Sequence, residues 1–299
     1  MAQPLTWKAY MNSENNPVYE EGSRYIPFDK LNLAVQVARA IDRPLLLYGQ
    51  PGSGKSSLAK YVAYKEDLRY YEHVTTSRTQ ARDLLWSYDD VRRLGDAQVP
   101  DRLKGNDQYV VPGTLWWAFD RDSAEKLGTE PFQAWNQDPS RVGRGAVVLV
   151  DEIDKADSDL PNGLLAPLVA RRFAVTDIDG GEMVEETGSS LIVITSNRER
   201  KLPQAFERRC VVYRIPSHGE GELREITDLH LLRSGQHVDR EMLTGLMTEF
   251  QEARRNAHRD GRREPSTAEF LDAVSACAAL GDESVSDIVS MIFTKDADG

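Results

Sequence analysis

The sequence lacks most features of secreted, membrane-spanning and strongly basic proteins. Its two cysteines, Cys210 and Cys277, have no metal-site spacing and suggest no disulfide framework. No apolar run approaches the length of a membrane span, and Met1 to Asn16 lacks the apolar core of a signal peptide. The formal net charge of -11 argues against a protein that binds nucleic acid mainly through its overall charge. We therefore expect a cytosolic protein in a reducing compartment, without a membrane partner.

The composition is that of an ordinary globular chain. Hydrophobic residues make up 40% of it and charged residues 28%, which is usual for a folded protein. A length of 299 residues predicts one large domain or two linked domains. Composition shifts predict an extended polar arm over 1–22, a core over 23–217 and a helical domain over 218–299, with 218–220 as a hinge.

Five short apolar runs predict the strands of the core. They are 45–48, 69–74, 146–150, 191–195 and 211–215. Continuous runs of this kind are typical of a parallel sheet that is covered on both faces. Helical spacing predicts a helix between Phe28 and Ile41 and helices throughout 221–293, and a glycine turn predicts a hairpin over 173–186. Residues 75–108 are expected to be irregular. The fold class is therefore α/β, with a five-stranded parallel sheet, flanking helices and a small helical domain.

Residues Gly49 to Ser56 match the phosphate-loop pattern G-x-x-x-x-G-K-[ST]. The loop follows the apolar run 45–48 and precedes a helix-like stretch, which is the context that the motif requires. Its glycines let backbone N–H groups close around phosphate oxygens. Lys55 can reach the β- and γ-phosphates, and the Ser56 hydroxyl can bind Mg²⁺. A glycine-rich turn without a ligand is the alternative interpretation.

Polar residues follow the next two buried runs. Asp151 and Glu152 end the run 146–150, where a Mg²⁺ ligand and a general base are expected beside a phosphate loop. Asn197 ends the run 191–195 and is expected to orient water or sense the γ-phosphate, although an isolated asparagine there is more often a cap or turn residue. Asp154 is expected to be a helix-capping or surface carboxylate.

Several other groups have a structural and a functional interpretation. The pairs Tyr70-Tyr71 and Trp116-Trp117 are expected to pack in the core. The basic segment 254–263 is interpreted as a solvated helix end, with a nucleotide contact or an acidic partner as the alternatives. Arg208 and Arg209 could each be surface charge, or could reach the γ-phosphate of a neighbouring subunit.

The order of these motifs resembles that of an AAA+ ATPase of the P-loop NTPase class over about 25–299. The finer resemblance is to the MoxR-type branch, which includes CbbQ/NorQ-like proteins and relatives of the magnesium-chelatase AAA subunit. Three stretches carry it: Tyr25-Ile26-Pro27, the segment 111–119, and the segment 160–165 with the hairpin that follows. The resemblance implies a core with an insert in its second helix, and a C-terminal helical lid.

The resemblance also implies roles for individual residues. ATP would be bound by Tyr25, Ile26, Pro51, Gly52, Ser53, Gly54, Lys55, Ser56 and Ser57, and Mg²⁺ by Ser56 and Asp151. The catalytic set would be Lys55, Glu152, Asn197 as first sensor, and Arg209 as the arginine given to a neighbour, with Arg208 as second choice. One departure is notable: Ala268 or Glu269 stands where the family has its second sensor arginine, and Arg262 or Arg263 could replace it.

The resemblance finally implies a ring homo-oligomer, expected to be a hexamer, that remodels or activates a separate client or a von Willebrand A-domain protein. Two alternatives remain open at this point. The basic segment 254–263 would suit a nucleic-acid-linked motor or defence component, and the missing second sensor would suit a slow nucleotide-dependent switch. The sequence favours ATP without excluding GTP.

Overall fold

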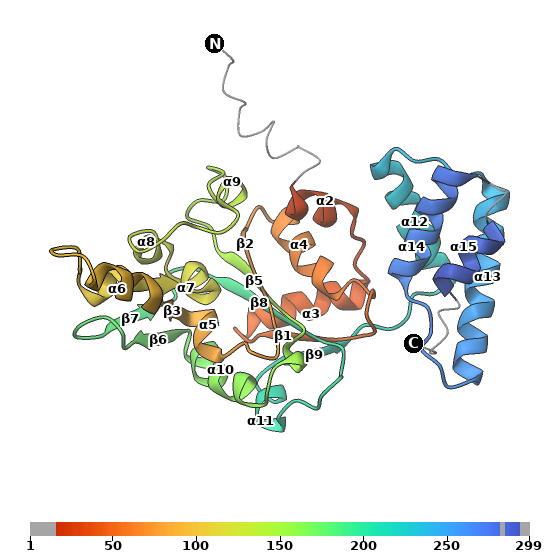
Figure 1. Ribbon diagram of the computed structural model, residues 1–299. Helices are drawn as coiled ribbons and strands as arrows, with labels where there is room; N and C mark the ends of the chain where they lie inside the picture. Colours follow the sequence, from red (N-terminus) through yellow and green to blue (C-terminus); the bar gives the residue numbers. More distant parts are fainter. Residues whose placement is uncertain (1–15, 282–284, 294–299) are drawn as a thin grey trace, which may run out of the picture. The chain divides into compact units, whose positions relative to one another are not determined.

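The computed structural model describes residues 16–281 and 285–293 (Figure 1). The chain divides into two compact units. The first contains the residues up to Ser23 together with Pro27–Tyr48 and Ser56–Arg214; the second contains Arg24–Ile26, Gly49–Lys55 and the chain from Ile215 onward. Each unit has its own hydrophobic core.

A five-stranded parallel sheet with the order β2-β5-β8-β1-β9 forms the centre of the first unit. The strands are Leu45–Tyr48 (β1), Arg69–Val74 (β2), Ala146–Asp151 (β5), Ser190–Ser196 (β8) and Val211–Arg214 (β9). All of β1 and β8 is buried, as is β5 up to Val150. Burial on both faces explains the unbroken apolar runs, and the predicted parallel sheet is confirmed.

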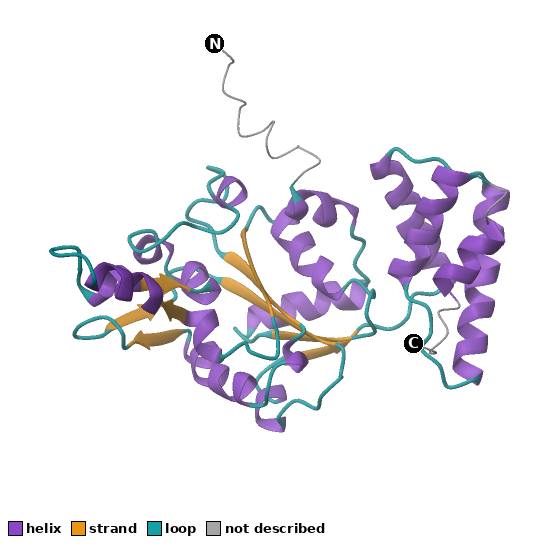
Figure 2. Cartoon of the chain, viewed as in Figure 1, coloured by secondary structure: helices purple, strands orange, loops and turns teal. Residues whose placement is uncertain are grey.

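Helices cover both faces of this sheet. The helices of the first unit outside 75–112 are Pro17–Arg24 (α2), Asp29–Ala40 (α3), Lys55–Lys65 (α4), Thr114–Phe119 (α7), Arg121–Ala124 (α8), Gln133–Asn136 (α9), Asp159–Ala170 (α10) and Gln204–Glu207 (α11). Helices α3 and α4 lie on one face, and α7 and α10 on the other (Figures 1 and 2). Trp116 and Trp117 of α7 are buried, as are Tyr70 and Tyr71 of β2, so the prediction that these aromatic pairs pack in the core is confirmed.

The extended arm predicted for residues 1–22 is wrong over its last part, because Pro17–Arg24 is helical. The Asn16 side chain accepts hydrogen bonds from the backbone N–H groups of Val18 and Tyr19, at 3.1 and 3.3 Å. This is a helix N-cap followed by a proline at the first helical position. Val18 is fully buried and fixes the helix to the core. Residues 1–15 lie outside the described residues.

Residues 75–112 and the predicted hairpin pack against each other in the first unit. The segment 75–112 contains Ala81–Leu85 (α5), Trp86–Tyr88 (β3), Asp90–Ala97 (α6), a 3₁₀ turn at Asn106–Tyr109 and Val110–Pro112 (β4), so the irregular structure predicted up to 108 is wrong. The predicted hairpin is confirmed as Arg172–Val175 (β6) and Glu182–Glu185 (β7). Trp86 joins the two parts: its indole N–H donates to Asp177 at 2.7 Å and its ring stacks on Phe173.

Within the described residues, the second unit contains four helices from the C-terminal part of the chain: Glu220–Ser234 (α12), Arg240–Arg259 (α13), Thr267–Leu280 (α14) and Val285–Phe293 (α15). Asp239 caps α13 through the N–H of Met242 at 2.8 Å, and Ser266 caps α14 in a reciprocal capping box with Glu269. Phe250 and Phe270 meet in the core with ring centroids 4.8 Å apart. The helices predicted for this part of the chain are confirmed there. Over 16–281 and 285–293, no helix combines the length and apolar character needed to cross a membrane.

Candidate active site

The segment Gly49–Lys55 connects β1 to α4 and has the backbone of a tight loop. Gly52 and Gly54 have φ values of 73° and 83°, a region that favours glycine. A Cβ at Gly52 would lie 2.6 Å from Ser266 Oγ, and one at Gly54 would lie 2.8 Å from the Tyr25 ring. No side chain therefore fits at either glycine. The Tyr25 ring packs against this loop, where the resemblance places a nucleotide-binding segment.

Lys55 is buried within this loop. Its ammonium donates to the carbonyl oxygens of Gly49 and Gln50 at 2.9 and 2.8 Å. Only 6% of the residue is exposed. The Lys55 ammonium is therefore held within the loop by neutral carbonyl oxygens. A negatively charged phosphate oxygen is a stronger acceptor and can replace them.

Ser56 and Asp151 come together although 95 residues separate them. The Ser56 hydroxyl donates to Asp151 Oδ1 at 2.7 Å. The hydroxyl of Thr195, on the neighbouring strand β8, donates to the same carboxylate oxygen. The carboxylate at the end of β5 is thus fixed by two hydroxyls. A hydroxyl and a carboxylate at this separation are the oxygen ligands that suit Mg²⁺ beside a phosphate group, so the residues present fit that ion.

Glu152 is held in an unusual backbone conformation. Its φ and ψ are 57° and 48°, which costs free energy for a residue other than glycine. Its N–H donates to the Thr195 hydroxyl at 2.9 Å, and its Oε1 accepts from the Asn197 amide at 2.9 Å. Its other oxygen is paired with Lys155. The hydrogen bond that Lys155 donates to Glu152 raises the pKa of Lys155.

Asn197 lies between Glu152 and Asp154. Its side-chain oxygen is buried and has no hydrogen-bond partner among the described residues. Asp154 is 1% exposed and accepts from the N–H groups of Asn197 and Glu199, at 3.3 and 2.8 Å. The prediction of a helix-capping or surface carboxylate is therefore wrong. Through these two hydrogen bonds, Asp154 fixes the backbone after β8. This places the Asn197 amide against Glu152.

The two candidate arginines before the last strand lie at the surface of the first unit. Arg208 and Arg209 are both exposed. The Arg209 guanidinium donates to the carbonyl oxygen of Ala205 at 2.9 Å, within its own turn. The preceding Glu207 accepts a hydrogen bond from the Tyr48 hydroxyl, at the end of β1. Burial and this carboxylate raise the pKa of Tyr48. Glu207, the residue before the two arginines, is thus hydrogen-bonded to Tyr48, which directly precedes the phosphate-loop motif.

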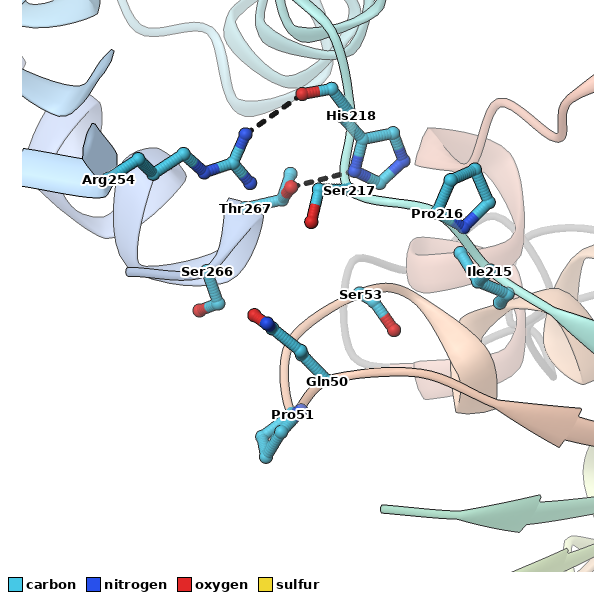
Figure 3. Close-up of a pocket in the computed structure, with 10 residues that line it drawn as sticks. All are labelled: Gln50, Pro51, Ser53, Ile215, Pro216, Ser217, His218, Arg254, Ser266 and Thr267. Atoms are coloured by element: carbon cyan, nitrogen blue, oxygen red, sulfur yellow. Dashed lines mark hydrogen bonds between the residues drawn. The ribbon is translucent and has the colours of Figure 1, made fainter. Parts of the chain in front are cut away.

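A small pocket lies in the second unit, beside the loop (Figure 3). It is lined by Gln50, Pro51, Ser53, Ile215, Pro216, Ser217, His218, Arg254, Ser266 and Thr267. The Arg254 guanidinium donates to the carbonyl oxygens of Pro265 and His218, at 3.2 and 2.9 Å. His218 Nδ1 and the Thr267 hydroxyl form a 2.7 Å hydrogen bond, and burial lowers the pKa of His218.

The residues expected to replace the second sensor arginine have other partners. Arg262 is paired with Asp260, and Arg263 with Glu269. Glu269 also closes the capping box of α14, and Ala268 donates its N–H to the Gly52 carbonyl at 3.3 Å. Neither Arg262 nor Arg263 lines the pocket.

Sequence reasoning missed two residues of the site. One is Arg254, which lines the pocket and was named only within the basic segment 254–263, and the other is Thr195, which supports Asp151. For Thr195 a signal existed, since it is a polar residue at the end of a buried apolar run.

Comparison with known proteins agrees with this geometry. The family model described as AAA domain (dynein-related subfamily) matches residues 44–210. That range spans β1 to the turn after α11 and includes the loop, Asp151, Glu152, Asn197 and both arginines. A search of curated proteins found no match.

Among solved structures with low sequence identity, NtrX shares the fold, and two others are similar at lower TM-scores. NtrX from Brucella abortus, solved with ADP, is 12% identical with a TM-score of 0.50, and the match covers 87% of this chain and 53% of NtrX. A variant of RuvB from Thermotoga maritima is 14% identical with a TM-score of 0.46, over 97% of this chain and 72% of RuvB. A candidate ATPase from Cytophaga hutchinsonii is 11% identical with a TM-score of 0.44, over 96% and 87%.

Proposed function

Because the chain belongs to the AAA domain family (dynein-related subfamily), we propose that it is a Mg²⁺-dependent ATP hydrolase of the MoxR type that works as a ring. One observation carries the chemical part of this proposal. The Ser56 hydroxyl meets the Asp151 carboxylate at 2.7 Å, while the next residue, Glu152, is held by the Asn197 amide at 2.9 Å. The Ser56–Asp151 pair, which is suited to Mg²⁺, and the Glu152 carboxylate, which is suited to accept a proton, are therefore adjacent at the end of β5.

Each group then has a defined task in hydrolysis. The backbone of Gly49–Lys55 and the Lys55 ammonium would bind the phosphates, and Ser56 and Asp151 would hold Mg²⁺. The metal ion would neutralise charge on the phosphate oxygens. Glu152 accepts a proton from the attacking water, and the Asn197 amide orients the Glu152 carboxylate. Most of the rate enhancement would come from positioning and electrostatics, since little covalent chemistry is left to the protein.

The exposed arginines support a shared active site. Among the described residues, no ion pair joins Arg208 or Arg209 to a carboxylate, and both lie on a short exposed turn. Such a turn is a suitable place for a group given to a neighbouring subunit. A repeated head-to-tail interface that closes on itself gives a ring, and six subunits is the expectation from the MoxR resemblance. Nucleotide turnover would then drive rearrangement of a protein client, or of a von Willebrand A-domain partner encoded separately.

The nucleic-acid alternative has less support than the protein-client proposal. Within the basic segment 254–263, Arg254 donates to two backbone carbonyls, Arg262 pairs with Asp260, and Arg263 pairs with Glu269. Two of these arginines are therefore paired with carboxylates, and the third is bonded to backbone carbonyls of its own unit, which leaves less positive charge for a nucleic acid to contact. Salt-sensitive stimulation of hydrolysis by DNA or RNA would reverse this preference.

Removing the metal-binding carboxylate tests the chemistry. Asp151→Asn should lower Mg²⁺-dependent phosphate release by about 100-fold or more, because a metal contact contributes several kcal/mol of charge stabilisation. Chelation of Mg²⁺ should abolish the activity of the unmodified protein. Asp228→Asn, at an exposed site on α12, is the matched control and should behave as the unmodified protein. Equal rates in Asp151→Asn and the control would refute the assigned role of Asp151.

A further inference from the structure

Tyr48 is a buried tyrosine at the point where the sheet meets the phosphate loop. It is the last residue of β1, and it pairs with Ser196 of β8 on one side and with Arg214 of β9 on the other. Only 5% of it is exposed. Its hydroxyl donates a hydrogen bond to the carboxylate of Glu207, the last residue of α11, 159 residues further along the chain. One side chain therefore joins the start of the loop to the turn that carries the two candidate arginines.

The hydrogen bond between Tyr48 and Glu207 is charge-assisted. A hydroxyl that donates to a carboxylate forms a stronger bond than two neutral groups do. Burial, followed by the Glu207 carboxylate, raises the pKa of Tyr48, so its hydroxyl remains a donor near neutral pH. Among the described residues, Glu207 forms no ion pair, and Tyr48 is the side chain to which it is bonded. Loss of the hydroxyl would therefore leave a partly buried carboxylate without its partner, which costs free energy.

Two arginines fix the ring of Tyr48. The Arg198 guanidinium lies 4.8 Å from the ring centroid, and the Arg214 guanidinium lies 5.4 Å from it. Cations at this distance attract an aromatic ring. Arg198 directly follows Asn197 and has a φ of 66°, which is strained for a residue other than glycine. Tyr48 therefore also contacts the turn that carries the candidate first sensor.

The helix that carries Glu207 is short, so its orientation depends on its contacts. Helix α11 has four residues, of which Phe206 is buried. Apolar packing is not directional, so Phe206 alone does not set the rotation of the turn. Two directional side-chain contacts remain: the bond from Tyr48 to Glu207, and a 3.3 Å hydrogen bond from Arg43 to the Arg208 carbonyl. Arg43 precedes β1, so only the Tyr48 contact comes from the edge of the sheet that carries the site.

We propose that Tyr48 and Glu207 are positioning residues, which hold the turn Arg208–Arg209 in the orientation that serves the active site of the neighbouring subunit. This inference rests on the proposed function, since it assumes a ring in which Arg209 completes the next site. Neither residue of the pair touches the reacting atoms, and both act through Arg209. The pair would link adjacent sites, because a residue beside one phosphate loop orients the arginine that the next site uses.

The first test measures rate and affinity separately. Tyr48→Phe removes the hydroxyl and keeps the ring between the two arginines. At saturating Mg²⁺-ATP, hydrolysis should fall by about 10- to 100-fold, because a misplaced catalytic group costs up to about 100-fold. ATP affinity should change by less than about threefold, since the loop of the same subunit is intact. Glu207→Ala should have the same two effects, and the double variant should be no slower than either single variant, because both remove one interaction. Tyr88→Phe, which loses a hydroxyl bond to Asn106, is the control and should keep the normal rate.

Mixed rings separate an effect on the neighbour from an effect on the subunit's own loop. In rings of Tyr48→Phe and Glu152→Gln, some sites combine the intact Glu152 of a Tyr48→Phe subunit with the intact arginine turn of a Glu152→Gln neighbour. Such mixtures should hydrolyse ATP faster than either variant alone. A tyrosine that only supports its own loop would give no recovery, because every subunit with an intact Glu152 would carry the damaged loop.

A mixture of Arg209→Ala with Glu152→Gln is the reference for recovery. If the reference mixture does not recover, the shared site of the proposed function is refuted. If the reference recovers and the Tyr48→Phe mixture does not, the inference about Tyr48 alone is refuted. A normal rate in Tyr48→Phe, or a loss of ATP affinity that matches its loss of rate, would also contradict that inference. Thermal melting checks that each variant folds, and Glu207→Ala takes the place of Tyr48→Phe in the mixture if the latter does not fold.

Discussion

Glu152→Gln should hydrolyse ATP at least about 100-fold more slowly than the unmodified protein while still binding it, since general-base catalysis contributes about 10²- to 10⁴-fold. The amide keeps the shape of the side chain but no longer accepts a proton. Its oxygen can still accept the hydrogen bond from Asn197, so the local structure should persist. The contact with Lys155 weakens, because a neutral amide replaces a carboxylate.

Phosphate release and nucleotide affinity should be measured in parallel for this variant. Glu249→Gln, an exposed substitution on α13, is the control. A rate for Glu152→Gln within about threefold of the control would be too small a loss for a general base and would remove Glu152 from the catalytic set. Because this variant should retain ATP, it is also suited to capturing the client by affinity purification.

Arg209→Ala should lower hydrolysis by about 10³-fold or more, since an arginine supplied to the transferring phosphate contributes about 10³- to 10⁵-fold in other nucleotide hydrolases. Each subunit should still bind ATP, because Arg209 serves the site of its neighbour. Arg208→Ala should have a smaller effect, because Arg208 is only the second choice for this role and its backbone contact with Arg43 survives the substitution.

Mixing two inactive variants shows whether the arginine acts between subunits. In rings that contain both Arg209→Ala and Glu152→Gln, some sites combine an intact Glu152 with an intact Arg209 from the next subunit. Such mixtures should therefore regain activity that neither variant has alone. If Arg209 acted within its own chain, no mixture would contain a complete site, and the absence of recovery would contradict the shared-site proposal.

The local parts of the site were predictable from sequence because they depend on contiguous residues. The phosphate-loop pattern, the Asp151-Glu152 pair and Asn197 each follow a buried apolar run, and parallel strands bring their carboxyl ends to one edge of a sheet. The hydrogen bonds from Ser56 to Asp151 and from Asn197 to Glu152 follow from that topology.

Contacts made across long sequence separations were not predictable. Asp154 looks like any surface carboxylate until the turn after β8 folds over it and buries it. Arg254 lies in a basic run whose pattern resembles a solvated helix end. Only the packing of α13 and α14 beside the loop 49–55 distinguishes it from Arg255, its exposed neighbour. The short helix α6 was missed because the segment 75–108 has no extended apolar periodicity.

The most direct test of the central claim is a titration of Lys55→Ala with Mg²⁺-ATP, beside the unmodified protein. Lys55 is buried in its loop and offers its charge where the phosphates are expected. We expect ATP binding in the micromolar to millimolar range for the unmodified protein, on the order of typical substrate affinities, and a loss of about 100-fold or more without the ammonium. Equal ATP affinity in a correctly folded Lys55→Ala variant would contradict the claim that this loop holds the triphosphate.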